Sequence, residues 1–426
     1  MINNFFNALS SFKNRGGFHI FFSTIFSKIT AFIVSFVIVR LISKNDYGVF
    51  SYAFSFIVIL LPFSGFGLNY SFLRFGVLKT TAEEKWSLFI EMLIRGLFYS
   101  IFFFIVISII SIFMPFSITG AKTIIILLSL QIITTFPYEI FNSYLRVLKL
   151  NNKFAFSTII FSLVYLFSNL AGTYLWGLKG LITAKIISPF IATVLLVPGI
   201  KDWFKFSFSF KKSDFEYEKY GLFVGFGSIA NQLLYSLDTI MLGYFIVQPD
   251  IIAEYRVATI IPFSLMFIPI VFMQTDFVFI SENYKNASYL RKYFQKISCL
   301  MFFTSSILFL FFTFFSKDIL TLLFGKQYAG SSSLFNIFLI GLIGAFSFRI
   351  PLGNILAAVG LSKQNAIVAY IMLGLDIIFN FFLINRFGAK GAAMASSLVM
   401  WLSGFFSFII FKNYLNKIKI NQKNTI

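Results

Sequence analysis

The sequence predicts an all-α polytopic membrane protein with about twelve transmembrane helices in two lobes of about six helices each. The first observation is composition. Of the 426 residues, 58% are hydrophobic and only 12% are charged, whereas a soluble domain has about 25% charged residues. The second is that apolar runs longer than about 18 residues recur along the whole chain, without the period-two alternation of an outer-membrane barrel. The third is that segments of the first half recur in the second half.

Apolar runs separated by charged, glycine and proline residues define the expected spans. In the first half we expect spans over residues 18–41, 49–75, 86–115, 122–144, 154–176 and 181–200. In the second half we expect them over 220–245, 258–279, 297–324, 333–359, 366–384 and 389–411.

The longest polar stretch lies between the two sets of spans. Residues 201–219 (KDWFKFSFSFKKSDFEYEK) carry many charges and no apolar run long enough to cross a bilayer. We therefore expect an N-terminal lobe over residues 1–200, a cytoplasmic linker over 201–219, and a C-terminal lobe over 220–426 that ends in a basic tail.

Three pairs of segments indicate the internal repeat: RLISKNDYGVFSYA (40–53) with YFIVQPDIIAEYRVA (244–258), LRVLKLNNKFA (145–155) with LAAVGLSKQNA (356–366), and WGLKGLITAKIIS (176–188) with FGAKGAAMASSLV (387–399). The last two pairs share one offset, which aligns Gly177 with Gly388 and Gly180 with Gly391. Because an even number of spans separates equivalent points, the halves share an orientation. A pseudo-two-fold axis along the membrane normal is therefore expected.

Prolines recur in equivalent spans of the two halves. Pro62 lies in the second span and Pro262 in its counterpart, while Pro137 and Pro351 lie in the fourth and tenth spans. A proline inside a helix frees a carbonyl group and bends the helix. We expect bent helices at these places, either because they line a cavity or because proline is common in membrane helices.

The formal charge of +19 comes mainly from lysine and arginine in short loops. These residues are clearly more common in the loops on the side of the N-terminus, so both termini are expected in the cytoplasm. The positive-inside rule explains the charge, and no nucleic-acid partner is expected. With one cysteine, Cys299, one histidine, His19, and no nucleotide-binding motif, we expect no cofactor, no metal centre of the cysteine or histidine type, and no enzymatic activity.

Basic residues within or beside the spans are candidate substrate ligands. A charge at the bilayer centre costs about 2.5–3.5 kcal/mol, so such a side chain faces a partner or a wet cavity. Lys28, Lys185 and Arg349 lie inside spans, and Arg74 and Arg256 lie at span ends. We interpret all five as candidates for binding an anionic substrate, Arg349 because guanidinium matches phosphate oxygens in pairs. For the three inside spans the alternative is a structural ion pair, most strongly for Lys185.

Acidic residues within spans suggest ion coupling. Asn231 and Asp238 lie two helical turns apart and share a face, and Asp376 lies in the eleventh span. They are candidates for binding a cation or a proton, with interhelical hydrogen bonds and a salt bridge as the alternative. Glu91 and Arg95 have the favourable i, i+4 order, and we interpret them as a structural pair.

Four segments resemble the polysaccharide and O-antigen flippases of the multidrug/oligosaccharidyl-lipid/polysaccharide exporter superfamily: RLISKNDYGVFSYA, LDTIMLGYF, GLSKQN and GAKGAA. The resemblance extends over residues 18–411. It implies a MATE-like fold whose two lobes surround a cavity that opens alternately to either side. It also implies that the chain moves an undecaprenyl-diphosphate-linked oligosaccharide from the cytoplasmic to the outer leaflet of the bacterial inner membrane, with a polysaccharide polymerase or glycosyltransferases as possible partners.

By this resemblance, Lys28, Arg74 and Arg256 match places where related flippases carry basic cavity residues. Asp238, in LDTIMLGYF, matches the aspartate of the family's corresponding stretch. The second half carries further buried acids, which favours a neutral or weakly acidic glycan. A proton or sodium gradient acting at Asp238 is a candidate energy source. Two alternatives remain open: a cation-coupled multidrug antiporter that uses Asp238 and Asp376, and a non-transporting scaffold for glycan assembly enzymes.

Overall fold

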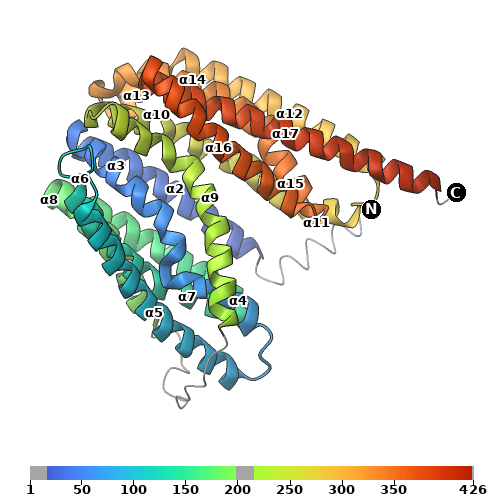
Figure 1. The fold of residues 1–426 in the computed structure, drawn as a ribbon, viewed down its shortest axis with the longest axis horizontal. Coiled ribbons are helices and arrows are strands. Elements are labelled where there is room, and N and C mark those ends of the chain that lie inside the picture. The colour runs from blue at the N-terminus through green and yellow to red at the C-terminus, as the bar shows by residue number, and fades with distance from the viewer. Residues whose placement is uncertain (1–16, 198–214, 425–426) are drawn as a thin grey trace. The chain divides into compact units, whose positions relative to one another are not determined.

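The computed structural model describes residues 17–197 and 215–424. The chain divides into two compact units, Met1–Gln232 and Leu233–Ile426. Within the described residues every regular element is a helix (Figure 1), and ten helical segments are long and apolar enough to cross a membrane. The expected all-α polytopic membrane fold is therefore confirmed.

The first unit contains α2 (Gly17–Leu41), α3 (Lys44–Leu60), the 3-10 turn η1 (Leu61–Gly67), α4 (Leu68–Gly76), α5 (Ala82–Phe113), α6 (Ala121–Ser129), α7 (Gln131–Val147), α8 (Asn151–Leu196) and the beginning of α9 (Glu216–Phe245). Local chemistry sets several of these boundaries. Ser43 caps α3 by accepting a hydrogen bond from the Asp46 amide, and Thr81 and Glu84 form a capping box at the start of α5.

The expected bend at Pro62 is present as a break in the second span. Pro62 opens the 3-10 turn η1, and the following residues Ser64, Gly65 and Phe66 leave helical geometry. The Ser64 hydroxyl donates to the Ile132 carbonyl of α7 at 2.7 Å. The break in the helix is thus stabilised by the Ser64 hydrogen bond to α7 as well as by Pro62.

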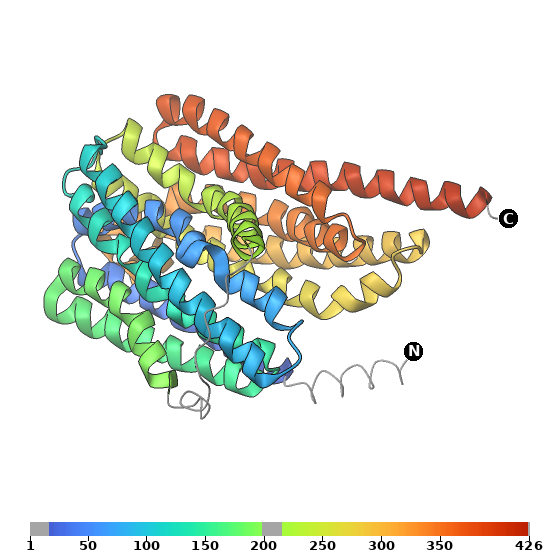
Figure 2. The same ribbon diagram turned by 60° about the horizontal axis from the view of Figure 1, so that its bottom comes forward.

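Helix α8 contains the fifth and sixth expected spans and folds back on itself at Gly177, which has φ 57° and ψ −133°. Figure 2 shows its two arms side by side in the green part of the chain. A Cβ atom on Gly180 would overlap the Gly172 carbonyl oxygen, so the arms approach backbone to backbone. Only glycine combines this φ and this approach without strain.

The second unit contains the rest of α9, then α10 (Pro249–Leu265), α11 (Phe267–Glu282), α12 (Ala287–Phe314), α13 (Ser316–Phe324), η3 (Lys326–Ser331), α14 (Ser332–Gly344), the π-helical turn η4 (Ala345–Arg349), α15 (Ile350–Ala358), α16 (Ser362–Phe387) and α17 (Ala389–Asn424). The π turn ends at Arg349, two residues before Pro351. A proline leaves a carbonyl unpaired, and a π turn accommodates that loss.

The predicted repeat is present in the backbone conformation of each unit. Gly388 joins α16 to α17 with φ 60° and ψ −137°, nearly the angles of Gly177. Lys149 and Gly360 also have positive φ, 58° and 85°. The turn at Lys149 is closed by a 2.9 Å hydrogen bond from the Leu150 amide to the Leu145 carbonyl, and the turn at Gly360 has the equivalent bond at 2.8 Å.

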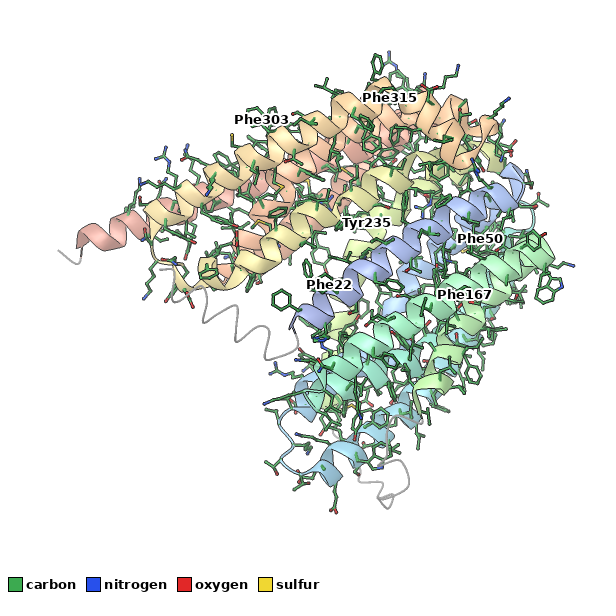
Figure 3. The ribbon with its side chains drawn as sticks, turned by 180° about the vertical axis from the view of Figure 1, so that it is seen from behind. Phe22, Phe50, Phe167, Tyr235, Phe303 and Phe315 are labelled. Carbon is green, nitrogen blue, oxygen red and sulfur yellow. The ribbon has the colours of Figure 1, made fainter. Side chains whose placement is uncertain are left out.

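Large apolar side chains cover the outer faces of several long helices. On α12, Phe303 is 63% exposed and Phe314 81% exposed, and Figure 3 labels Phe303 on this helix. On α5, Phe98 and Phe113 are similarly exposed. Such surfaces are stable against lipid tails and would be costly in water.

The predicted linker lies mostly outside the described residues, which exclude 198–214. Its last residues belong to α9, which begins at Glu216. The division between the two units falls inside α9, between Gln232 and Leu233.

Candidate functional site

Asp238 is the centre of a buried polar cluster in the second unit. Its side chain on α9 accepts hydrogen bonds from the Tyr255 hydroxyl of α10 at 2.6 Å and from the Asn380 amide of α16 at 2.7 Å. The Ser396 hydroxyl of α17 also donates to it. Asp238 is 2% exposed. Four helices therefore converge on one carboxylate, which is shielded from lipid.

Asp376 adds a second carboxylate to this acid cluster, which we define as Asp238, Tyr255, Asp376, Asn380 and Ser396. The Asn380 amide nitrogen bridges the two acids, because it donates to Asp238 at 2.7 Å and to one carboxylate oxygen of Asp376 at 3.1 Å. One oxygen of Asp376 and the Asn380 side-chain oxygen are buried without a hydrogen-bond partner. Two buried negative charges need a proton or a cation to balance them, because the low dielectric penalises unpaired charge. Oxygen atoms of this kind suit a small hard cation.

Three further polar residues, Asn231, Asp276 and Arg349, are not members of the acid cluster as defined above. The side chain of Asn231 is outside the described part of the chain. Asp276 on α11 accepts a 2.8 Å hydrogen bond from the Tyr293 hydroxyl of α12. Arg349 is half-buried, with its guanidinium carbon 5.9 Å from the Tyr235 ring centre, and its charge acts on Asp376.

Lys28 is exposed near the middle of α2. No hydrogen bond or ion pair joins its ammonium to the other described residues. The same helix carries apolar side chains, among them Phe22, which is 64% exposed (Figure 3). An ammonium at this depth cannot remain against lipid without a large cost. The position therefore favours a polar neighbour for the Lys28 ammonium.

Arg74 and Arg256 differ in their surroundings. Arg74, exposed at the end of α4, has its guanidinium carbon 4.9 Å from the ring centre of Tyr220. This stacking leaves guanidinium hydrogens available for an anion. Arg256 is half-buried on α10, next to Tyr255 of the acid cluster.

Lys185 is buried, with an exposed fraction of 7%. Its ammonium donates to the Tyr165 hydroxyl and lies 4.5 Å from the Tyr165 ring centre and 5.0 Å from that of Phe54. Lys185 therefore contacts a hydroxyl and two aromatic rings, and no ion pair, the structural alternative for this residue, is present among the described residues.

Glu91 and Arg95 form the expected ion pair on α5, with 3.0 Å between nitrogen and oxygen. Arg95 also pairs with Glu218 at the beginning of α9, and the Tyr99 hydroxyl donates to Glu218 at 3.0 Å. The pair is thus part of a network that joins α5 to α9 within the first unit. Glu218 is 4% exposed, while Glu91 and Arg95 are half-buried.

Sequence reasoning missed Tyr255, Asn380, Ser396 and Glu218. Asn380 follows Asp376 by one helical turn, and this i, i+4 spacing within an apolar span is a signal that could have identified it. In the first pair of repeated segments Tyr255 corresponds to Phe50, and the hydroxyl of Tyr255 distinguishes the two halves. Ser396 and Glu218 carry no local signal, because their partners are distant in the chain.

The comparisons agree with this fold. Residues 37–333 match a family described as polysaccharide biosynthesis protein. An uncharacterized membrane protein of Methanocaldococcus jannaschii is 25% identical, and the match covers 92% of this chain and 82% of the relative. Among solved structures, an inward closed conformation of the lipid II flippase MurJ has a TM-score of 0.74 and 19% identity, over 94% of this chain and 90% of that one. An inward-facing multidrug resistance MATE family transporter of the MOP superfamily has a TM-score of 0.69 and 15% identity, over 92% and 95%.

Proposed function

Because the chain belongs to the polysaccharide biosynthesis protein family, we propose that it is a flippase for an undecaprenyl-diphosphate-linked oligosaccharide. The cargo is an O-antigen, capsule or other surface repeat unit, moved from the cytoplasmic to the outer leaflet by alternating access. The family match carries this proposal. The fold shared with a protein named a lipid II flippase supports transport of a lipid-linked substrate. The protein acts in the bacterial cytoplasmic membrane with both termini in the cytoplasm.

The diphosphate is bound by basic side chains that have no strong partner. Lys28 supports this role most directly, because it is exposed in mid-helix and needs a polar neighbour. The Arg74 guanidinium stacks on the Tyr220 ring, and its N–H groups remain available to bind an anion. Arg256 and Arg349 are half-buried residues of the second unit. Binding in a wet cavity spares the sugars the cost of crossing hydrocarbon.

The acid cluster is the coupling site in this proposal. Asp238 and Asp376 bind a sodium ion or a proton, together with the oxygen of Asn380 that lacks a hydrogen-bond partner. Charge balance at the cluster then depends on the occupant, so a cation gradient biases the conformational equilibrium.

A deletion strain tests the cargo. We expect surface glycan to be lost, with complete lipid-linked repeat units remaining on the cytoplasmic leaflet. Gel analysis of surface glycan and a leaflet assay with a membrane-impermeant sugar-modifying enzyme measure the two quantities. Normal surface glycan, or repeat units that reach the outer leaflet at the wild-type rate, would contradict the proposal.

Substitution of Lys28 tests the binding site. Lys28→Ala should lower flipping at least about tenfold, the effect of losing roughly 1.4 kcal/mol of interaction with the diphosphate. Lys28→Arg, which keeps the charge, should retain most activity. The matched control is Lys363→Ala, which changes a lysine at the start of α16. Equal flipping by Lys28→Ala and wild type, at equal membrane abundance, would remove Lys28 from the site.

The acid cluster also favours a second candidate, a cation-coupled multidrug antiporter. Two buried carboxylates suit exchange of a cation for an organic cation, and the MATE fold supports this reading. In the same deletion strain, this candidate predicts normal glycan together with new sensitivity to cationic dyes.

A further inference from the structure

The acid cluster has an equivalent position in the first unit. The alignment that matches the two glycine kinks continues without gaps through both helical hairpins, formed by α8 in one unit and by α16 with α17 in the other. It pairs Tyr165 with Asp376, Asn169 with Asn380, and Lys185 with Ser396. Three members of the acid cluster therefore have counterparts on α8.

The local geometry of the two positions agrees. The Asn169 amide donates to the Tyr165 carbonyl at 2.7 Å, and the Asn380 amide donates to the Asp376 carbonyl at 2.9 Å. Both asparagines are fully buried. The side-chain oxygen of each lacks a hydrogen-bond partner. The two hairpins thus present the same amide oxygen at the same place.

The two positions differ in charge. In the second unit, Asp238 and Asp376 supply two carboxylates. In the first unit, the Lys185 ammonium is held by the Tyr165 hydroxyl and by the ring faces of Tyr165 and Phe54. Hydroxyl and aromatic faces stabilise a cation without a counter-charge. No ion pair joins Lys185 to a carboxylate in the described part of the chain.

We infer that Lys185 is a tethered cation, which holds in the first unit the position that an exchangeable monovalent cation takes in the second. The inference rests on the coupling site proposed above. A lysine ammonium cannot leave, so the first unit remains in the equivalent of its cation-loaded state throughout transport. The chain therefore has one exchangeable cation site, and coupling acts through the second unit alone.

The test moves the lysine to the aligned position. Because Lys185 reaches Tyr165, a lysine at position 396 should reach Asp376, the residue aligned with Tyr165. Ser396→Lys should therefore mimic the bound cation, while Ser396→Met adds similar length without charge. The full chain is purified, and its Tm is measured in sodium chloride and in choline chloride of equal ionic strength, together with binding of radioactive sodium.

We expect sodium to raise the Tm of the wild type by a few degrees. Ser396→Lys should have the raised Tm in both salts and bind no sodium, and Ser396→Met should have the low Tm in both. A sodium-dependent Tm in Ser396→Lys, or a Tm in choline no higher than that of Ser396→Met, would overturn the inference. Failure of Ser396→Lys to fold while Ser396→Met folds would also overturn it.

A substitution in the first unit gives an independent measurement. Lys185→Met should keep the wild-type sodium stoichiometry, because the exchangeable site lies in the other unit. Loss of sodium binding in this variant would contradict the inference. A wild type whose Tm responds to neither sodium, lithium, potassium nor protons would instead contradict the proposed coupling site. The two failures are therefore distinguishable.

Discussion

Replacement of Asp238 separates the structural and ion-binding roles of the acid cluster. Asp238→Ala removes the acceptor of three interhelical hydrogen bonds, from Tyr255, Asn380 and Ser396. Asp238→Asn removes the charge but keeps an acceptor oxygen of the same shape. We expect both variants to lose cation binding and only the alanine variant to lose substantial stability.

The expected cost follows from the partners that remain. Interhelical hydrogen bonds in a bilayer contribute about 0.6 kcal/mol on average and about 1.7 kcal/mol at most, so three bonds contribute roughly 2–5 kcal/mol. Tyr255 and Ser396 lie 3.3 Å apart and can bond to each other, while Asn380 keeps the Asp376 carbonyl at 2.9 Å. The cost of Asp238→Ala should therefore lie near the lower bound, about 2 kcal/mol, and that of Asp238→Asn below about 1 kcal/mol.

The assay measures reversible unfolding in detergent, with and without sodium, and flipping in the deletion strain. Asp238→Asn should fold and reach the membrane at wild-type abundance, but sodium should not shift its Tm and its flipping should be impaired. Asp276→Asn is the matched control, because this acid contacts Tyr293 outside the acid cluster. A wild-type sodium shift in Asp238→Asn would refute the cation site, and a cost for Asp238→Ala well above 5 kcal/mol would refute the assumption that its donors find other partners.

Two further predictions concern the helices themselves. Gly180→Ala and Gly391→Ala should each lower the free energy of unfolding by about 1–3 kcal/mol or more, since the added methyl group would overlap a backbone carbonyl. Gly374→Ala is the control and should be tolerated, because open space surrounds Gly374. Equal membrane yield of all three variants would contradict the close backbone approach. Glu218→Gln should lower the free energy of unfolding by about 1–2 kcal/mol. This is less than the cost of fully breaking a buried ion pair, because Arg95 still pairs with Glu91 on its own helix. An unchanged Tm would show that the network contributes nothing to stability.

The sequence by itself determined the membrane fold and the repeat. Apolar runs of spanning length have one stable solution in lipid, the helix, because every backbone polar group must be paired within the segment. The aligned glycines at 177 and 388 predicted equivalent turns, and a positive φ with a close backbone approach is a local requirement that glycine alone meets. Lys28 and Asp238 were identified because a charged side chain within an apolar span is costly in a bilayer, whatever the rest of the fold.

Only the tertiary structure decided what each charge meets. Lys185 and Lys28 are both lysines within apolar spans, yet Lys185 is enclosed by two aromatic rings and a hydroxyl while Lys28 is exposed. Glu218 lies within the predicted linker, and in the structure its carboxylate pairs with Arg95 on a helix more than a hundred positions earlier in the chain. Ser396 became part of the acid cluster because the hairpin brings α17 back to α9. Partners of this kind depend on packing between distant segments, and no local pattern encodes that packing.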